Sequence, residues 1–312
     1  MSFQDKLKES LKNKGLADSS IKMYIRNLIK LNDDLPINKL NFLNNFDDVI
    51  NKLAKFKKNT VRGYLISIVS VLSLFKNDNK KNEKLFNKYY DHMIKINNEI
   101  KEIPKEEKDK NIKMNLITWE DVENKLNELY KEIETFTNKK IINENQYNKL
   151  LSLVVLACFV YLPPRRSKDY ALLKIVKKYN DNLDKNFNYL DHSNKKLYFN
   201  NYKTNSTYGQ QVIEIPDNLF NLINLLIKYH PNINNKINSK TNDFLFVNYK
   251  NKPLNISNGI TLLLNKVFNK KISSSMLRHI YLTSKYKDVN DEKKKDAEMM
   301  AHNATTQNNY IV

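Results

Sequence analysis

The first 77 residues carry apolar side chains at helical spacing. One apolar stripe runs through residues 21–28, and Ser19 or Ser20 stands before it as a predicted helix cap. A second stripe runs through residues 61–75, after Asn59, which is another predicted cap. Amphipathic helices of this kind bury their apolar faces against one another. The pattern therefore predicts a compact helical bundle.

The next stretch is rich in Lys, Glu and Asn. Helical spacing of apolar residues continues over 85–100, which predicts one more helix. A proline and the charged run at 105–110 then end the pattern, as in a linker. We interpret residues 78–115 as a helix and a charged linker, which separate a first domain at 1–77 from a second domain at 116–312.

The second domain opens with two helix signals. Thr118 and Asp121 have the spacing of a capping box, so a helix is predicted to begin near Trp119. Residues 143–162 are strongly apolar and are followed by two prolines, which end a helix because the residue before a proline is pushed out of helical geometry. We predict that this segment is the buried core helix of the domain.

Three short runs further along have the composition of β-strands. They span residues 187–190, 196–199 and 211–215 and are separated by turn-rich segments, which predicts a small antiparallel sheet. Helical spacing returns over 218–227 and 256–267. The predicted fold class is therefore mainly α, with a helical N-terminal domain and a mixed α/β second domain that contains the small antiparallel sheet.

The chain is strongly basic. It has 53 Lys and Arg residues against 34 Asp and Glu residues, and its formal net charge is +19. Such a charge favours a polyanionic partner, with DNA or RNA first. Abundant Lys together with abundant Asn also arises from an AT-rich genome whatever the protein does, so charge alone leaves the partner open.

The chain has one cysteine, Cys158, in the apolar run of the predicted core helix. A lone cysteine there is a small core hydrophobe, and we expect no disulfide framework and no cysteine-based metal site. No apolar stretch reaches membrane-spanning length, and the first residues lack the pattern of a signal peptide. We expect a soluble, intracellular protein with no membrane partner.

Four separated segments of the second domain hold candidate chemistry. Their candidate catalytic residues are Arg166, Lys203, Arg278, His302 and Tyr310. Each residue has an ordinary explanation when it is taken alone. Arg166 could be a surface arginine paired with Asp169, and Lys203 a solvated lysine. His302 could be a structural histidine, and Tyr310 is one of 18 tyrosines.

In order and spacing, these segments resemble the catalytic domain of the tyrosine recombinase (phage integrase) family. In that family an arginine follows a core helix and precedes an acidic residue by three positions, as Arg166 precedes Asp169. Arg165 fits this register less well. The family's lysine lies at a β-hairpin ahead of a strand that ends in a proline, and Lys203 stands similarly before residues 212–216.

The resemblance continues to the C-terminal end. The family's second arginine lies in a His-x-Leu-Arg-His pattern within a helix, and Arg278 lies in a similar pattern in which Ser275 takes the first position. An Ala-His pair that ends at His302 precedes Tyr310, as a Gly-His or Ala-His pair precedes the family's tyrosine. The N-terminal bundle likewise resembles the family's core-binding domain.

The resemblance implies a role for each catalytic residue. Tyr310 would attack a DNA phosphate and form a 3′-phosphotyrosine, while Arg166 and Arg278 would hold the non-bridging oxygens. His302 would add a hydrogen bond, and Lys203 would protonate the leaving 5′ oxygen. A phenol has a reference pKa of about 10, so Tyr310 needs nearby positive charge. The chemistry needs neither a metal nor a cofactor.

Two features depart from the family's pattern. Ser275 stands where a histidine is usual, and a serine donates a hydrogen bond but takes up no proton at neutral pH, so we assign it phosphate binding only. His279 follows Arg278 directly and is a weaker candidate for phosphate binding, since bracing of the helix is its more natural role.

The second departure is that the chain ends at Val312, whereas many relatives carry a further helix that docks on a neighbouring protomer. Either this protein assembles differently, or a tail is missing.

On this resemblance we expect a site-specific recombinase or integrase from a mobile element or virus. It would act on double-stranded DNA and self-associate there as a dimer or tetramer. A type IB topoisomerase shares the same catalytic residues, but the small helical N-terminal domain favours the recombinase. A catalytically inactive DNA-binding protein is the alternative from another class, and the retained Tyr310 and arginines argue against it.

Overall fold

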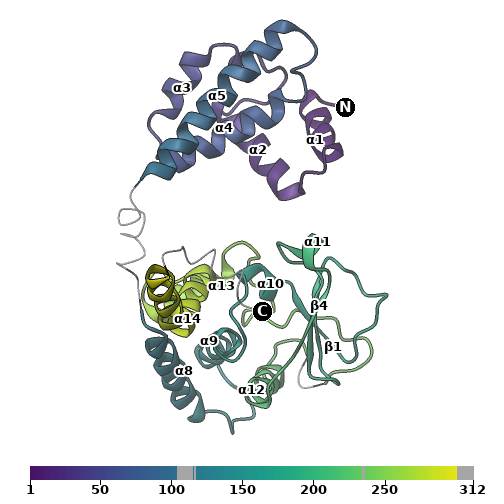
Figure 1. The fold of residues 1–312 in the computed structure, drawn as a ribbon. Helices are drawn as coiled ribbons and strands as arrows, with labels where there is room; N and C mark the ends of the chain where they lie inside the picture. The colour runs from purple at the N-terminus through teal and green to yellow at the C-terminus, as the bar shows by residue number, and fades with distance from the viewer. Residues whose placement is uncertain (104–114, 116, 234–235, 301–312) are drawn as a thin grey trace. The chain divides into compact units, whose positions relative to one another are not determined.

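The computed structural model describes residues 1–103, 115, 117–233 and 236–300. The chain divides into two compact units, Met1–Lys110 and Asn111–Val312. Both units are built mainly of helices, and the second unit also holds a four-stranded sheet (Figure 1). The predicted mainly α fold class is confirmed.

The first unit is a bundle of amphipathic helices around one apolar core. Its elements are α1 (Phe3–Asn13), α2 (Asp18–Leu31), η1 (Asn41–Leu43), α3 (Phe46–Leu53), α4 (Lys58–Leu72) and α5 (Lys80–Glu102). The two predicted apolar stripes lie on α2 and α4, which contact each other. Leu28, Leu65 and Ile68 in these stripes are fully buried. Burial of the apolar faces, more than helix propensity, stabilises such a bundle.

The helix caps predicted at Ser19 or Ser20 and at Asn59 are wrong. α2 begins at Asp18, one residue before Ser19, and α4 begins one residue before Asn59, with no side-chain cap in either helix. The three predicted caps therefore lie inside the first helical turns. In α2 the carboxylate of Asp18 lies in the first turn, where a negative charge is favourable near the N-terminal end of the helix dipole.

α5 belongs to the core of the first unit. It is longer than the helix predicted over 85–100, and it contacts α4. Its Tyr89 is fully buried, lies 5.0 Å from the ring of Phe46 between centroids, and donates a hydrogen bond of 2.8 Å to the Leu43 carbonyl. The sequence pattern groups this helix with the linker, but its apolar face needs a packing partner and finds one in the first unit. The charged run at 105–110 lies outside the described residues.

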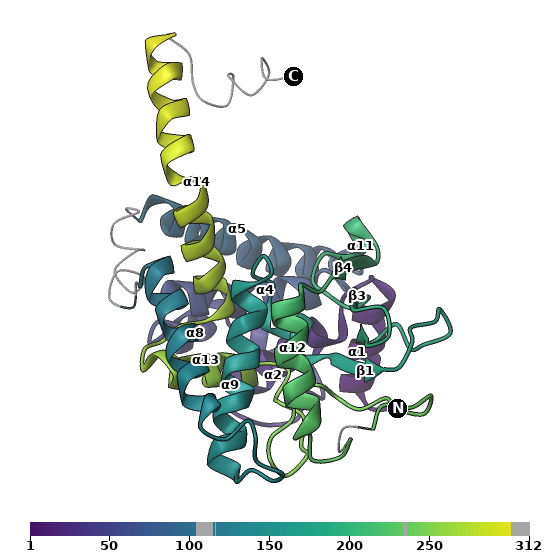
Figure 2. The ribbon, with the colours of Figure 1, turned by 90° about the horizontal axis from the view of Figure 1, so that it is seen from below.

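The second unit is organised around one buried helix. Its helices are α8 (Trp119–Glu134), α9 (Glu144–Val160), α10 (Ser167–Ala171), α11 (Asn205–Tyr208), α12 (Asp217–Lys228), α13 (Gly259–Phe268) and α14 (Ser274–Met299). α9 contacts α8, α12 and α13, and Figure 2 shows α8 and α12 on either side of it. Cys158 on α9 is buried, and burial raises the pKa of its thiol to about 12. The core-helix prediction is therefore confirmed, and Cys158 is a core side chain.

Capping boxes fix the starts of α8 and α9, and the box at the start of α8 was predicted. The Thr118 hydroxyl accepts from the Asp121 N–H at 3.0 Å, and the Asp121 carboxylate accepts from the Thr118 N–H at 2.7 Å. Asn143 and Gln146 form a second capping box at the start of α9. Each box supplies acceptors for N–H groups that a helix start leaves unpaired.

The sheet differs from the predicted antiparallel one. Its strands are β1 (Leu173–Val176), β2 (Asn188–Asp191), β3 (Lys196–Phe199) and β4 (Gln211–Glu214), in the order β1-β2-β3-β4. The pairs β2–β3 and β3–β4 are antiparallel, but β1 pairs with β2 in parallel, so the sheet is mixed. β1 was not predicted. Its residues Leu173, Ile175 and Val176 are all buried, so the sequence lacks the alternation of apolar and polar residues that is typical of a half-exposed strand.

A buried histidine makes the stability of the second unit sensitive to pH. His230 is fully buried; its Nε2 lies 2.9 Å from the Phe244 carbonyl, and its Nδ1 accepts from the N–H groups of Asn232 and Ile233. Burial lowers its pKa, although the bond to Phe244 and the charge of Asp243 oppose the shift. The folded state therefore takes up a proton less readily than the unfolded chain.

We expect the free energy of unfolding to fall as the pH drops below about 6.5, the ordinary histidine value, because protonation then favours the unfolded chain. His230→Gln should be less stable at pH 7.5 but should lose this pH-dependent part. Urea unfolding at pH 7.5 and 5.5, followed by fluorescence of Trp119, the single tryptophan, measures the effect in this unit. An equal change of midpoint in the parent and in His230→Gln would contradict the assignment.

Candidate active site

The turn between α9 and α10 holds two adjacent arginines in different environments. Arg165 has a side chain that is only 14% exposed, and its Nε donates to Asp169 at 3.0 Å. Its Nη1 donates to the Gln211 side chain at 2.7 Å, and its guanidinium carbon lies 3.9 Å from the ring centroid of Phe199 and 5.1 Å from that of Tyr202. The Arg165 guanidinium is therefore fixed by an ion pair, a hydrogen bond and two aromatic rings.

The surface pair considered for Arg166 and Asp169 is not formed. Arg166 is the N-cap residue of α10 with an extended backbone, and Arg165, four residues before Asp169, takes the ion pair. Arg166 is half-buried, and no described residue forms a hydrogen bond or ion pair with its side chain. Within the described residues its guanidinium donors thus make no hydrogen bond, although its charge acts on Asp169 and lowers the pKa of that carboxyl, whereas the donors of Arg165 are partly used.

Asp169 is the buried acidic partner of Arg165 in this turn. Its side chain is almost completely buried, and burial raises its pKa above the usual aspartate range, while the Arg165 guanidinium opposes that shift. One carboxylate oxygen carries the ion pair, and the other has no hydrogen-bond partner among the described residues. Losing the arginine would leave an uncompensated buried group, so Arg165 and Asp169 act as one structural pair.

The same turn is bonded to the start of α14. The Ser167 N–H donates to the Ser274 hydroxyl at 3.0 Å, and the Ser167 hydroxyl donates to it at 2.9 Å. Ser274 is buried and begins α14, and Arg278 lies one turn further along the helix and is half-buried. The structure thus brings the element with Arg166 against the helix with Arg278, although the two arginines are 112 positions apart in the sequence.

Ser275 and His279 both lie on α14 and are exposed. Positions 275 and 279 are four apart, so both side chains lie on one face of the helix. That face is exposed among the described residues, and it is not the face of the buried Leu277. The exposure fits the binding roles considered for both residues, and no described contact supports bracing by His279.

Lys203 lies on the connection between β3 and β4. It is exposed and directly follows Tyr202, whose ring faces Arg165 and whose hydroxyl donates to the Gly209 carbonyl at 2.7 Å. Gly209 has φ of +64°, a conformation that side chains rarely adopt, so glycine permits this turn. Arg165 contacts both Tyr202 before the turn and Gln211 after it. The connection that carries Lys203 is therefore tied to the arginine turn.

His302 and Tyr310 lie outside the described residues. Four residues of this region were not predicted as site residues: Arg165, Tyr202, Gln211 and Ser274. Only Arg165 had a recognisable sequence signal, namely its position beside Arg166. Gln211 and Ser274 matter because of partners 46 and 107 positions away, which no local pattern reports.

Comparisons with protein-family models, with curated proteins and with solved structures found no match. Within the part of the chain that the structure describes, no cluster of three or more His, Cys, Asp or Glu residues could hold a metal ion. Among the same residues, no helix has both the length and the apolar character needed to cross a membrane.

Proposed function

We propose that this chain is a site-specific DNA recombinase that cleaves and rejoins double-stranded DNA through a covalent 3′-phosphotyrosine at Tyr310. The observation that carries the proposal is the meeting of three distant segments. The turn with Arg166 is hydrogen-bonded to the helix with Arg278, and Arg165 ties that turn to the connection with Lys203. Three cationic side chains thus stand on contacting elements, as phosphate chemistry requires.

The proposed reaction needs few groups. The Tyr310 oxygen bonds to phosphorus as its proton passes to water, and the bond from phosphorus to the 5′ oxygen breaks. Arg166 and Arg278 stabilise the negative charge that gathers on the non-bridging oxygens, and His302 adds a hydrogen bond. Lys203 gives a proton to the leaving 5′ oxygen. Attack by the 5′-hydroxyl of a second DNA end then releases the tyrosine and rejoins the strand.

The finer parts of the proposal concern biology and assembly. We propose integration of a mobile or viral genome, with two or four copies assembled on DNA. Ser275 and His279 would bind the phosphate from the exposed face of the first α14 turns.

Incubation with nicked suicide substrates taken from the flanks of the encoding element tests the proposal. A denaturant-resistant protein–DNA adduct supports it, and binding without an adduct on any such substrate favours an inactive DNA-binding protein. Relaxation of supercoiled plasmid by the monomer favours a type IB topoisomerase.

We expect DNA affinity to weaken steeply with salt, because Lys and Arg side chains that neutralise phosphates release counterions. The logarithm of affinity should fall with the logarithm of salt at a slope of roughly −0.9 for each phosphate contact. Fluorescence anisotropy with a labelled duplex at several salt concentrations measures this slope. A slope near zero would contradict a protein that binds along the DNA backbone.

A further inference from the structure

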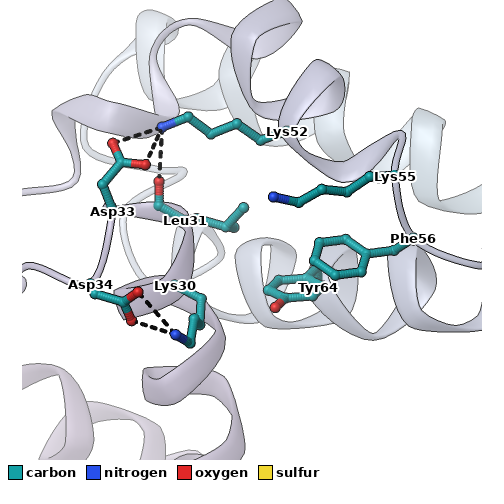
Figure 3. A pocket seen from close by; sticks show the side chains of 8 residues that line it. All are labelled: Lys30, Leu31, Asp33, Asp34, Lys52, Lys55, Phe56 and Tyr64. Atoms are coloured by element: carbon teal, nitrogen blue, oxygen red, sulfur yellow. Dashed lines mark hydrogen bonds and ion pairs between the residues drawn. The ribbon is translucent and has the colours of Figure 1, made fainter.

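The first unit contains a cavity that the proposed cleavage reaction does not use. It lies between the C-terminal end of α2, the end of α3 and α4, and has a volume of about 630 Å³. Pockets of this size take small organic ligands. Figure 3 shows Lys55, Phe56 and Tyr64 reaching into it toward Leu31.

One wall of the cavity is aromatic. The rings of Phe56 and Tyr64 stack with their centroids 5.4 Å apart and their planes at 23°. Phe56 is 37% exposed, which is high for a large apolar side chain in a bundle, and it lines the cavity. A planar ligand ring can extend such a stack, because base and side-chain rings attract one another through their faces.

The charges around the cavity leave one cation unpaired. Lys30 pairs with Asp34 at 2.7 Å, and Lys52 pairs with Asp33 at 2.9 Å. Lys55 forms no ion pair with any described residue, and its Nζ lies 5.5 Å from the ring centroid of Phe56. An anionic group would therefore be favoured close to the aromatic wall.

The rim of the cavity is a turn with two consecutive residues of positive φ. Asp33 and Asp34 follow one another with φ of +55° and +63°, a region that residues other than glycine usually avoid. Their ion pairs and the Asn32 side chain, which donates to the carbonyls of Leu35 and Pro36, hold this turn in place.

We propose that the cavity binds one unstacked nucleotide, with its base against Phe56 and Tyr64 and its phosphate at Lys55. A nucleotide combines the planar ring and the anionic group that the lining selects. It would come either from solution or from an unpaired position in a nucleic-acid strand. The inference does not rest on the cleavage chemistry, since all these residues lie in the first unit.

The test uses the full chain with Tyr310→Phe, so that loss of cleavage cannot affect the result. The probes are adenosine monophosphate, a short single strand, and an abasic strand of equal length. Phe56→Leu and Lys55→Ala should each weaken monophosphate binding by at least about fivefold in calorimetry. If the nucleotide comes from a strand, the base-bearing strand should bind more tightly than the abasic one, and Phe56→Leu should remove that difference.

A matched control exists in the same unit. Phe86 and Tyr90 also stack, at 5.7 Å and 19°, and Lys76 lies 5.3 Å from the Phe86 ring, but these residues do not line this cavity. Phe86→Leu and Lys76→Ala should leave binding unchanged, with folding of every variant checked by circular dichroism. The proposal fails if monophosphate does not bind and bases add nothing to strand affinity. It also fails if the control variants weaken binding as much as Phe56→Leu and Lys55→Ala.

Discussion

Replacing Tyr310 by phenylalanine should abolish covalent attachment to DNA and leave DNA affinity nearly unchanged. The substitution removes only the phenolic oxygen, which is the proposed nucleophile, and keeps every positive charge that binds phosphates. A nicked suicide substrate traps the covalent intermediate, because the short cleaved strand diffuses away and religation stops. A denaturing gel should therefore show a protein–DNA band for the parent and none for Tyr310→Phe.

Tyr286→Phe is the control for this experiment. Tyr286 lies on α14 and is 43% exposed, so the variant removes the same oxygen from another accessible tyrosine upstream of Tyr310. Its covalent band should match that of the parent. A band that persists in Tyr310→Phe, or that disappears in Tyr286→Phe, would mean that the nucleophile is another residue.

Arg278→Ala should slow single-turnover cleavage by about a thousandfold, because one preorganised donor at a developing oxyanion is typically worth a hundred- to a thousandfold and arginine adds its charge. Ser275→Ala should slow it less, since a serine supplies one neutral donor. A hydrogen bond to a charged group contributes about 1.5–3 kcal/mol, or roughly ten- to 150-fold in rate. Ser275→His should preserve or raise the rate. All rates are measured on one suicide substrate.

Lys287→Ala serves as the charge control, because it removes one exposed positive charge further along α14. Its cleavage rate should stay within a few-fold of the parent. If Ser275→Ala is as slow as Arg278→Ala, the serine does more than donate one bond. If Ser275→Ala cleaves like the parent, Ser275 does not contact the phosphate. An Arg278→Ala variant with the parent rate would remove Arg278 from the active site.

Much of the secondary structure can be read from the sequence, because helix caps, proline stops and the spacing of apolar residues depend on residues that are close together in the sequence. The start of α9 after its N-cap Asn143 and its end before Pro163 depend on capping atoms and on proline geometry within a few residues. The same local rules failed at Ser19 and Asn59, where the helices start one residue earlier without a side-chain cap. A cap is one stabilising bond, and packing of the whole helix outweighs it.

The parallel pairing of β1 with β2 could not be predicted in this way. β1 is buried on successive positions, and its pairing partner begins only after an intervening loop. α5 presents a related case, since its apolar stripe is visible in the sequence but its partner, α4, is not. A periodic pattern shows that one face is buried, and it carries no information on which surface covers that face.

For the candidate site, the sequence by itself determined which residue types stand in which order: Arg166, Lys203, Arg278, His302 and Tyr310. Only the tertiary structure decided which of the two adjacent arginines forms an ion pair with a buried carboxylate. Arg165 pairs with Asp169 and Gln211, while the Arg166 side chain forms no hydrogen bond or ion pair among the described residues. The reason is physical: a guanidinium takes the carboxylate and amide that folding brings within about 3 Å, and those partners come from α10 and from β4.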